Sequence, residues 1–449
     1  MRKLLAAGVV SLGLLGSCLS AAQEASADDS GSGAATVQSA EGAVSAAEVS
    51  VPLPEDLDES SQELDEAISL PAPAALEEQE PAAAADAPQD ESGVAEGIVA
   101  PDPVASAPDD EADCRARVAA AIAHGSESPV PCVTWGASAT TAELRAAADA
   151  WPTPKWCGEH GANGKWYVTR FKACGVFPSD LTVTDVRTGQ VTGRMHYLAV
   201  AYAYSKRDIK TWAYQVELLE VTSSGSAKGS SASGKATCAG KCKVAESKFP
   251  SQLMGASKDP VGQFFLDTTI QTSPKGQQGE GQASAAWRFT NPEWAAPSND
   301  VVLPTPPVRC DNALPATSKA GCVMPYIAEM VYAKNGEFPE LAQHIEYAQN
   351  TENLPGKHGT TRYLTRLTDR VKIRGNRTTA CPSSIVRPPN KSCDEYPFAS
   401  TWQGASTGGG NFSRRMINAT QNEDGGRALS RFYLYNRIIE KDKFLVWIK

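Results

Sequence analysis

The chain has 449 residues with a formal net charge of −10 at pH 7, a length that allows two or three domains and excludes a single small one. The charge is uneven, because residues 22–113 contain 24 Asp and Glu and no Lys or Arg, whereas the chain from Cys114 onward carries about +12. A basic globular part favours a polyanionic partner. The alternative is a basic surface that contacts only solvent.

The N-terminus has the pattern of an export signal over Met1–Ser20, with a positive start and an apolar stretch from Leu4 to Leu15. The stretch is too short for a convincing membrane span. Leu15-Gly16-Ser17-Cys18 resembles a bacterial lipobox, which implies lipidation of Cys18. Ordinary cleavage near Ser20 is the alternative. We therefore expect an extracellular protein, either lipid-anchored at the cell surface or secreted.

Residues 21–113 are rich in Ala, Pro, Ser, Asp and Glu and nearly lack aromatic side chains. Such a segment cannot bury enough apolar surface to offset the entropy lost on ordering. We expect a disordered acidic linker that acts as a spacer. Competition of this linker with a polyanionic ligand for the basic part is a second hypothesis.

Ten of the eleven cysteines follow Cys18. An even number in an exported chain favours disulfides. The sequence does not determine the pairing, but it suggests bridges between near neighbours: 114–132, 157–174, 238–242, 310–322 and 381–393. The C-x3-C spacing at 238–242 has no nearby His, which favours a structural disulfide over a metal or redox site.

Residues 114–308 are expected to form a β-rich domain of unknown function. Apolar and polar side chains alternate along Thr211–Val221, as in a half-buried strand. Further strand-like segments are 191–202, 264–270 and 285–289, with a Ser/Gly loop at 223–234 and a hinge at Pro304–Pro307. These features predict an antiparallel sandwich. We interpret its aromatic residues as core residues. The alternative is that they line a face that binds glycans or the cell wall.

The C-terminal domain, predicted at 309–449, is expected to mix helices and strands, so the fold class is α+β. Helical spacing covers 339–349, with His344 within its apolar face. The predicted order that follows is a strand at 392–401, a strand at 412–420, a helix at 427–438 and a last strand at 443–448. Strand, turn, strand and helix form a ββα arrangement.

The run Ser392-Cys393-Asp394-Glu395-Tyr396-Pro397-Phe398-Ala399-Ser400-Thr401 contains two adjacent carboxylates. In a strand they point to opposite faces, so only one is expected to face a reacting phosphate. Asp394 is the predicted general base and Glu395 a second catalytic carboxylate or metal ligand. Asn422, at the entry of the predicted helix, is the first choice for metal ligand, and such oxygen donors favour Mg²⁺ or Mn²⁺.

The acidic run closely resembles the signature of the NucA/NucB family of secreted bacterial deoxyribonucleases. Asn422 and Gly426 support the resemblance, as does the His344-Ile345 pair, over about residues 320–449. It implies a ββα-metal nuclease core in which a carboxylate stands where relatives of that fold use histidine. Gln421 departs from the Asp of shorter members, which puts the metal preference in doubt.

Three arginines complete the predicted site. Arg377 is expected to stabilise the charged transition state, and Arg366 and Arg414 to bind phosphate. A solvated basic loop is the alternative for Arg366 and Arg377. His344 is either a substrate contact or, as we favour, a residue that holds the region together.

We therefore predict a secreted or cell-surface, metal-dependent endodeoxyribonuclease that cuts DNA with weak sequence selectivity. It is expected to be a monomer without a nucleotide cofactor, and to meet the membrane only through a lipid anchor. A non-catalytic surface-binding lipoprotein and a toxin-like nuclease effector are the alternatives.

Overall fold

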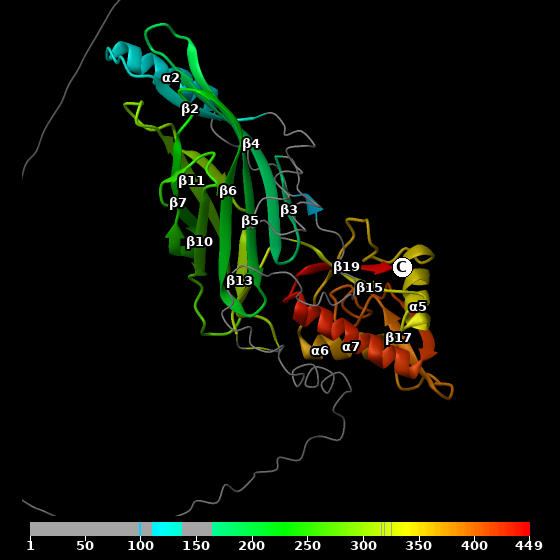
Figure 1. The fold of residues 1–449 in the computed structure, drawn as a ribbon. Helices are drawn as coiled ribbons and strands as arrows, with labels where there is room; N and C mark the ends of the chain where they lie inside the picture. Colours follow the sequence, from blue (N-terminus) through cyan, green and yellow to red (C-terminus); the bar gives the residue numbers. More distant parts are fainter. Residues whose placement is uncertain (1–97, 100–109, 137–163, 316, 318, 325) are drawn as a thin grey trace, which may run out of the picture. The chain divides into compact units, whose positions relative to one another are not determined.

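The computed structural model describes residues 98–99, 110–136, 164–315, 317, 319–324 and 326–449 (Figure 1). The predicted export signal, Cys18, Cys157 and most of the acidic linker lie outside these residues. The described chain is β-rich and has four helices, which confirms the α+β class. No helix within the described ranges is both long and apolar enough to span a membrane.

Two groups of elements make up the described chain. The N-terminal group comprises β1 Ile98–Val99, α2 Asp110–Ala123, β2 Val130–Trp135, β3 Trp166–Val168, β4 Lys172–Thr184, β5 Val191–Lys206, β6 Ile209–Gly225, β7 Ser231–Gly240, β8 Cys242–Lys248, β9 Gln252–Leu253, β10 Val261–Thr268, β11 Gln278–Thr290, β12 Val301–Pro304, β13 Val308–Asp311 and β14 Gly321–Val323. The C-terminal group comprises β15 Ala328–Tyr332, α5 Pro339–Asn350, β16 Leu364–Thr365, α6 Arg370–Ala380, β17 Lys391–Tyr396, β18 Ser413–Asn418, α7 Ala419–Tyr435 and β19 Lys443–Ile448.

The N-terminal group forms an antiparallel β-sandwich, as predicted. One sheet has the order β1-β3-β4-β5-β6-β10-β8 with β2 also on β4, and the other has the order β14-β13-β11-β7-β9 with β12 on β11. Along β10, buried residues alternate with half-buried ones, so that Phe264 and Leu266 point inward. They share one hydrophobic core with Trp287 and Phe289 of the other sheet.

The loop predicted at 223–234 is shorter than expected. Strand β6 continues to Gly225 and β7 begins at Ser231, so most of this Ser/Gly-rich segment is paired backbone. Small residues are needed here for close packing of the backbone. A Cβ at Gly234 would lie 2.4 Å from the backbone oxygen of Ala286. Close approach of backbone therefore explains a composition that is also typical of loops.

The sandwich extends beyond the boundary predicted at position 309. Residues 305–307 connect β12 and β13, which both pair with β11 of the same sheet. The core of the sandwich includes Met324 and Tyr326, whereas the next core begins at Ala328. The prolines at this point interrupt a strand and do not separate two domains.

Three of the predicted disulfides are confirmed: 238–242, 310–322 and 381–393. Cys174 is also disulfide-bonded, but its predicted partner Cys157 lies outside the described residues. Cys114 and Cys132 are free thiols, and Sγ of Cys114 lies 3.9 Å from the backbone oxygen of Val133, so the bridge predicted between the two cysteines is not formed in this structure.

The C-terminal group contains the predicted hairpin and helix. Strands β17 and β18 pair antiparallel, α7 follows directly, and both α5 and α7 pack against the hairpin (Figure 1). Helix α7 contacts α5 closely at Gly425, where a Cβ would lie 2.2 Å from the side chain of Leu341. Strand β19 lies between β15, to which it is parallel, and β16.

Two helices differ from the prediction. Helix α7 begins at Ala419 and not at Arg427, because Asn418 caps it by accepting a hydrogen bond from the backbone of Gln421. Helix α6 was not predicted, since its sequence is strongly polar and includes Gly375. Asp369 caps α6 through its side chain.

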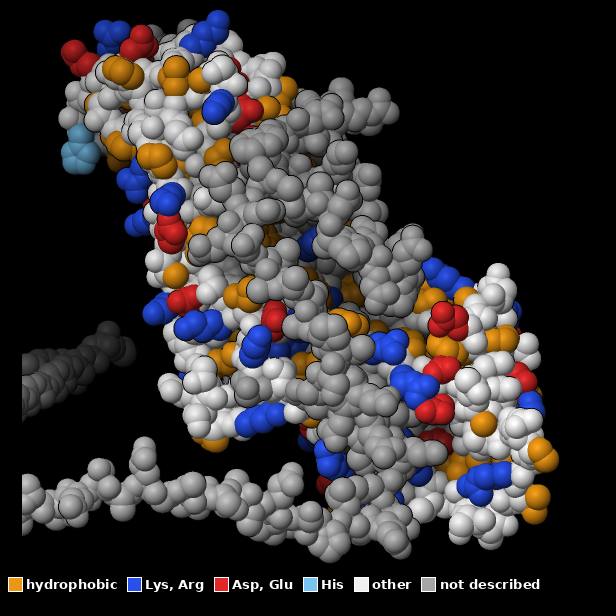
Figure 2. All heavy atoms as spheres, turned by 60° about the horizontal axis from the view of Figure 1, so that its bottom comes forward, with side chains coloured by type: hydrophobic (Ala, Val, Ile, Leu, Met, Phe, Trp, Pro, Cys, Tyr) orange, Lys and Arg blue, Asp and Glu red, His pale blue; other side chains and the backbone are white. Residues whose placement is uncertain are grey.

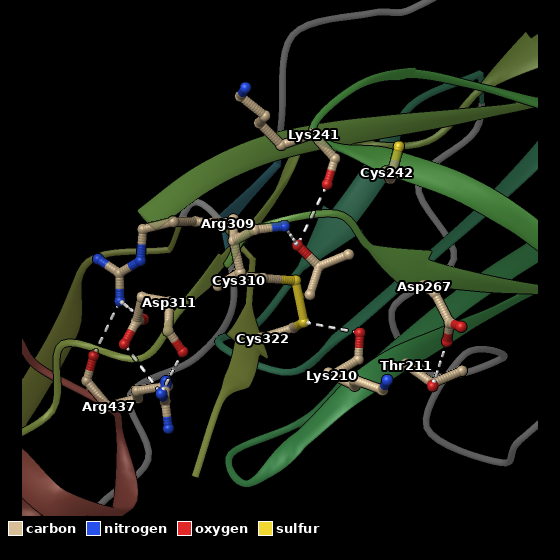
Figure 3. The surroundings of a disulfide bond; sticks show 12 residues. Lys210, Thr211, Lys241, Cys242, Asp267, Arg309, Cys310, Asp311, Cys322 and Arg437 are labelled. Atoms are coloured by element: carbon tan, nitrogen blue, oxygen red, sulfur yellow. Dashed lines mark hydrogen bonds and ion pairs between the residues drawn. A yellow bond between two sulfur atoms is a disulfide. The ribbon is translucent and has the colours of Figure 1, made fainter. Parts of the chain in front are cut away.

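A buried arginine joins the C-terminal group to the sandwich. Arg437 follows α7 and is fully buried, and its Nη2 lies 2.9 Å from the carboxylate of Asp311 in β13. Figure 3 shows both residues beside the Cys310–Cys322 disulfide. Arg437 also donates to the backbone oxygens of Arg207 and Asp311. The turn after α7 is thus bonded to two strand ends of the sandwich.

Asp442 forms a second connection at the same junction. Its carboxylate accepts hydrogen bonds from Arg309 of β13 at 2.5 and 2.6 Å and from Arg170, beside β3, at 3.1 Å. Burial lowers the pKa of Arg170 to about 10. Arg170 also donates to the backbone oxygens of Tyr326, Asn436 and Arg437, so its enclosed charge is compensated by several acceptors.

Candidate functional site

The hairpin of β17 and β18 separates the two predicted carboxylates. Asp394 pairs in register with Arg415, and Glu395 pairs with Arg414. Residues that are directly opposed in two paired strands point to the same face of the sheet, and successive residues of one strand point to opposite faces. Asp394 and Arg415 therefore occupy one face of the hairpin, and Glu395 and Arg414 occupy the other.

Asp394 is held by a histidine from α5 that is 50 residues away in sequence. Its Oδ2 lies 2.5 Å from Nδ1 of His344, and Nε2 of that ring lies 3.1 Å from Oγ of Ser413. If Nδ1 carries the proton, the ring donates to the carboxylate and accepts from the Ser413 hydroxyl, which satisfies both nitrogens. Both contacts come from one face of the hairpin.

Burial distinguishes the members of this cluster. The side chain of His344 is fully buried, whereas the side chain of Asp394 is 8% exposed. The imidazole therefore orients the carboxylate from the protein interior and does not face a substrate. This position agrees with the structural role favoured from the sequence and gives no support to a substrate contact by His344.

Asn422 lies in the first turn of α7, beside the same hairpin. Its Nδ2 donates to Oγ of Ser392 at 2.9 Å and to the backbone oxygen of Cys393 at 3.2 Å. With the amide nitrogen engaged, Oδ1 is the atom that remains to accept a hydrogen bond or to bind a cation. Asn422 thus approaches β17 from the face that carries Ser392 and Asp394.

Glu395 lies near the C-terminal end of α6. Its Oε2 is 3.7 Å from Sγ of Cys381, the residue that bridges α6 to β17. Arg377 is in the last turn of α6, and Arg414 donates to the backbone oxygen of Ala380 at 2.6 Å. The structure therefore gathers Glu395, Arg377 and Arg414 around one end of α6.

The predicted metal ligands do not share a face. Asn422 contacts the Ser392 side of β17, whereas Glu395 points to the opposite side. Glu395 is therefore not retained as a ligand of the same ion. The described ranges contain no group of three or more His, Cys, Asp and Glu that suits a metal. The Asn422 oxygen fits a hard ion that keeps water and phosphate oxygens as its other ligands.

Arg366 does not occupy the predicted phosphate-binding position. It is buried, its guanidinium lies 3.7 Å from the centre of the Tyr433 ring, and its Nη1 donates to the backbone oxygen of Ser400. Burial lowers the pKa of its guanidinium. Arg366 therefore packs the C-terminal core against α7 and does not present its charge to a ligand.

Arg415 is the basic residue that sequence reasoning missed. It shares the face of Asp394, is half-buried, and stacks 4.8 Å from the ring centre of Tyr347 in α5. The sequence contained two adjacent arginines, and only the register of the hairpin shows which of them accompanies Asp394. Arg415 adds positive charge beside the carboxylate.

Asn376 was also missed, although it orders the segment after β17. Its Nδ2 donates to the backbone oxygens of Ala399 and Thr401. Its Oδ1 accepts from the backbone nitrogens of Ser406 and Thr407. Through these four backbone contacts, the fully buried amide of Asn376 connects the segment between β17 and β18 to α6.

Charge is mixed on the face of the molecule that Figure 2 presents. Figure 2 shows Lys and Arg side chains interspersed with Asp and Glu on the face that it presents. The C-terminal part has an excess of basic residues, with 19 Lys and Arg against 13 Asp and Glu from Cys310 to Lys449. On this face the excess does not form one continuous basic surface. A polyanion site would therefore consist of particular rows of basic side chains.

Comparison with known proteins addresses the C-terminal part. No curated protein matches the chain significantly. The model of one protein family, described as deoxyribonuclease NucA/NucB, matches residues 347–447. This range contains β17, β18, α7 and the residues Asp394, Glu395 and Asn422. The resemblance inferred from the acidic run is thereby confirmed, and residues 347–447 form a domain of the NucA/NucB family.

Proposed function

We propose that this protein is an exported, metal-dependent endodeoxyribonuclease that hydrolyses DNA with weak sequence preference. The observation that carries the proposal is the Asp394–His344 pair, at 2.5 Å, in which Asp394 lies within the residues that match a deoxyribonuclease family. A carboxylate that is oriented by a buried imidazole and is itself 8% exposed is suited to accept a proton from a single bound water.

Each residue has a separate task in the proposed reaction. Asp394 takes the proton of the attacking water, and His344 keeps its carboxylate in one orientation. Asn422 would hold Mg²⁺ or Mn²⁺ through Oδ1. A bound divalent ion supplies neutralisation of phosphate charge and stabilisation of the leaving oxygen. Arg415 lies on the face of Asp394 and would contact the phosphate.

The location of the protein is part of the proposal. The pattern of Met1–Ser20 and the three disulfides between described cysteines support export. Anchoring through a lipid on Cys18, or release into the medium, would place the enzyme next to extracellular DNA. We propose that it acts as a monomer.

The test is nicking of supercoiled plasmid by the chain from residue 21 onward, purified with its disulfides oxidised. Wild type, Asp394→Asn and Asn422→Ala are assayed with Mg²⁺, with Mn²⁺ and with EDTA. Asp300→Asn, in an exposed ion pair of the sandwich, is the matched control. We expect cleavage by wild type and by the control only with metal, and loss of cleavage in both site variants.

The possible failures have different meanings. Cleavage that persists in Asp394→Asn would overturn the role of the base but keep the enzyme. Cleavage that persists in EDTA would refute metal dependence. Folded wild-type protein that cuts no DNA with either metal would favour the non-catalytic binding protein.

A further inference from the structure

Helix α6 has a charge pattern that its own stability does not explain. Its sequence RVKIRGNRTTA has four basic residues and no acidic one. Arg370, at the first position, and Lys372 place positive charge at the N-terminal end of the helix, where the helix dipole disfavours it. Arg370 and Arg374 are like charges at i and i+4, which also destabilises a helix.

Three of these basic residues are turned outward. Arg370, Lys372 and Arg374 are exposed, and none of them forms an ion pair with another residue in the described part of the chain. On the opposite side of α6, Asn376 and Ala380 are buried against the protein. The helix is thus held by its neutral side, and Arg370, Lys372 and Arg374 face solvent, whereas Arg377 is half-buried.

The arginines form one row along the helix. Arg370, Arg374 and Arg377 have the spacing i, i+4 and i+7, which places them on one stripe about 10 Å long. Lys372 lies on another side of the helix, where its Nζ is 4.4 Å from the ring centre of Trp402. A single DNA strand carries one phosphate charge per nucleotide, so a row of this length can contact more than one phosphate.

The row leads to the hairpin. The backbone oxygen of Arg377 accepts a hydrogen bond from Cys381, and Cys381 is bridged to Cys393 in β17. The next residues of β17 are Asp394 and Glu395. The disulfide thus fixes the end of the arginine row to β17, on the side of the hairpin that carries Glu395 and Arg414.

We propose that Arg370, Arg374 and Arg377 form a phosphate track that binds one strand of DNA and directs it toward β17. The inference rests on the proposed function, because it assigns the DNA contact of that site. Each guanidinium presents paired donors to phosphate oxygens without reading bases. The unfavourable charge pattern of α6 is relieved when the phosphates bind.

The test measures DNA binding without cleavage, in the Asp394→Asn background. Fluorescence anisotropy with a labelled duplex gives the affinity of Arg370→Gln/Arg374→Gln over a series of salt concentrations. The control is Arg187→Gln/Arg194→Gln, which removes the same charge from exposed positions in the sandwich. We expect the slope of log K against log salt to become less steep by about 2 in the track variant and to stay unchanged in the control.

Other results would overturn the track. An unchanged slope in Arg370→Gln/Arg374→Gln excludes it, and an equal loss in both double variants shows that only net charge matters. Arg370→Lys/Arg374→Lys should restore the slope, because it restores the charges, and a failure to do so also counts against phosphate contact. Circular dichroism confirms folding. Binding is measured in a protein that does not need to cleave, so failure of the track is distinguishable from failure of the nuclease proposal.

Discussion

The junction between the sandwich and the C-terminal group predicts a large cost for a small change at Asp442. Asp442→Asn keeps the size of the side chain but removes the carboxylate that accepts from Arg170 and Arg309. Removing one partner of a buried ion pair costs about 3–5 kcal/mol when the remaining charge is left uncompensated, but Arg309 keeps its contact with Asp311 at 3.2 Å. Asp442 and Arg309 are 18% and 16% exposed, so we expect the lower end, about 3 kcal/mol.

Thermal unfolding followed by tryptophan fluorescence measures this effect. A loss of about 3 kcal/mol corresponds to a decrease in Tm of about 6–12 °C for a domain of moderate size. The control is Asp300→Asn, whose ion pair with Arg288 is 38% and 45% exposed and should contribute less than about 1 kcal/mol. Equal, small decreases in Tm for the two variants would refute the view that the junction stabilises the C-terminal group.

Two further predictions concern α5. His344→Ala should lower the cleavage rate by about ten- to hundred-fold, the range for residues that orient a functional group, whereas His358→Ala, at a half-exposed position, should not. Equal rates at a temperature below both Tm values would contradict the positioning role. The hydrogen bond from Lys391 lowers the pKa of Glu340, so its contribution to stability is present above the ordinary pKa of 4.5 and is lost as the pH falls through the folded-state pKa. The Tm difference between wild type and Glu340→Gln should therefore shrink in acid, and a difference that does not depend on pH would show that the carboxylate charge is irrelevant.

Local patterns in the sequence predicted most individual elements. The helical spacing around His344, the alternation along Thr211–Val221 and the final strand at 443–448 correspond to α5, β6 and β19. These signals are readable within a few residues, although β6 buries both of its faces from Trp212 to Leu218 and is not the half-buried strand that its alternation predicted. The acidic run identified the domain because it is a contiguous motif.

Helix α6 was not predictable in the same way. Its polar sequence has no apolar stripe, and it is held by the fully buried Asn376, whose partners lie in the segment after β17. A single amide that binds four backbone groups has no periodic signature. The phosphate-binding role expected for Arg366 failed for a related reason, since the sequence does not show which arginines are covered.

The sequence by itself determined that this chain contains a NucA/NucB-type domain with a carboxylate on a strand, because motif and alternation are local properties. Only the tertiary structure decided that His344 orients Asp394, that Arg415 accompanies it, and that Arg437 and Asp442 join the domain to the sandwich. These contacts connect residues far apart in the chain. Their partners are selected by how the elements pack and by the need of buried charges and polar groups for a bonded neighbour.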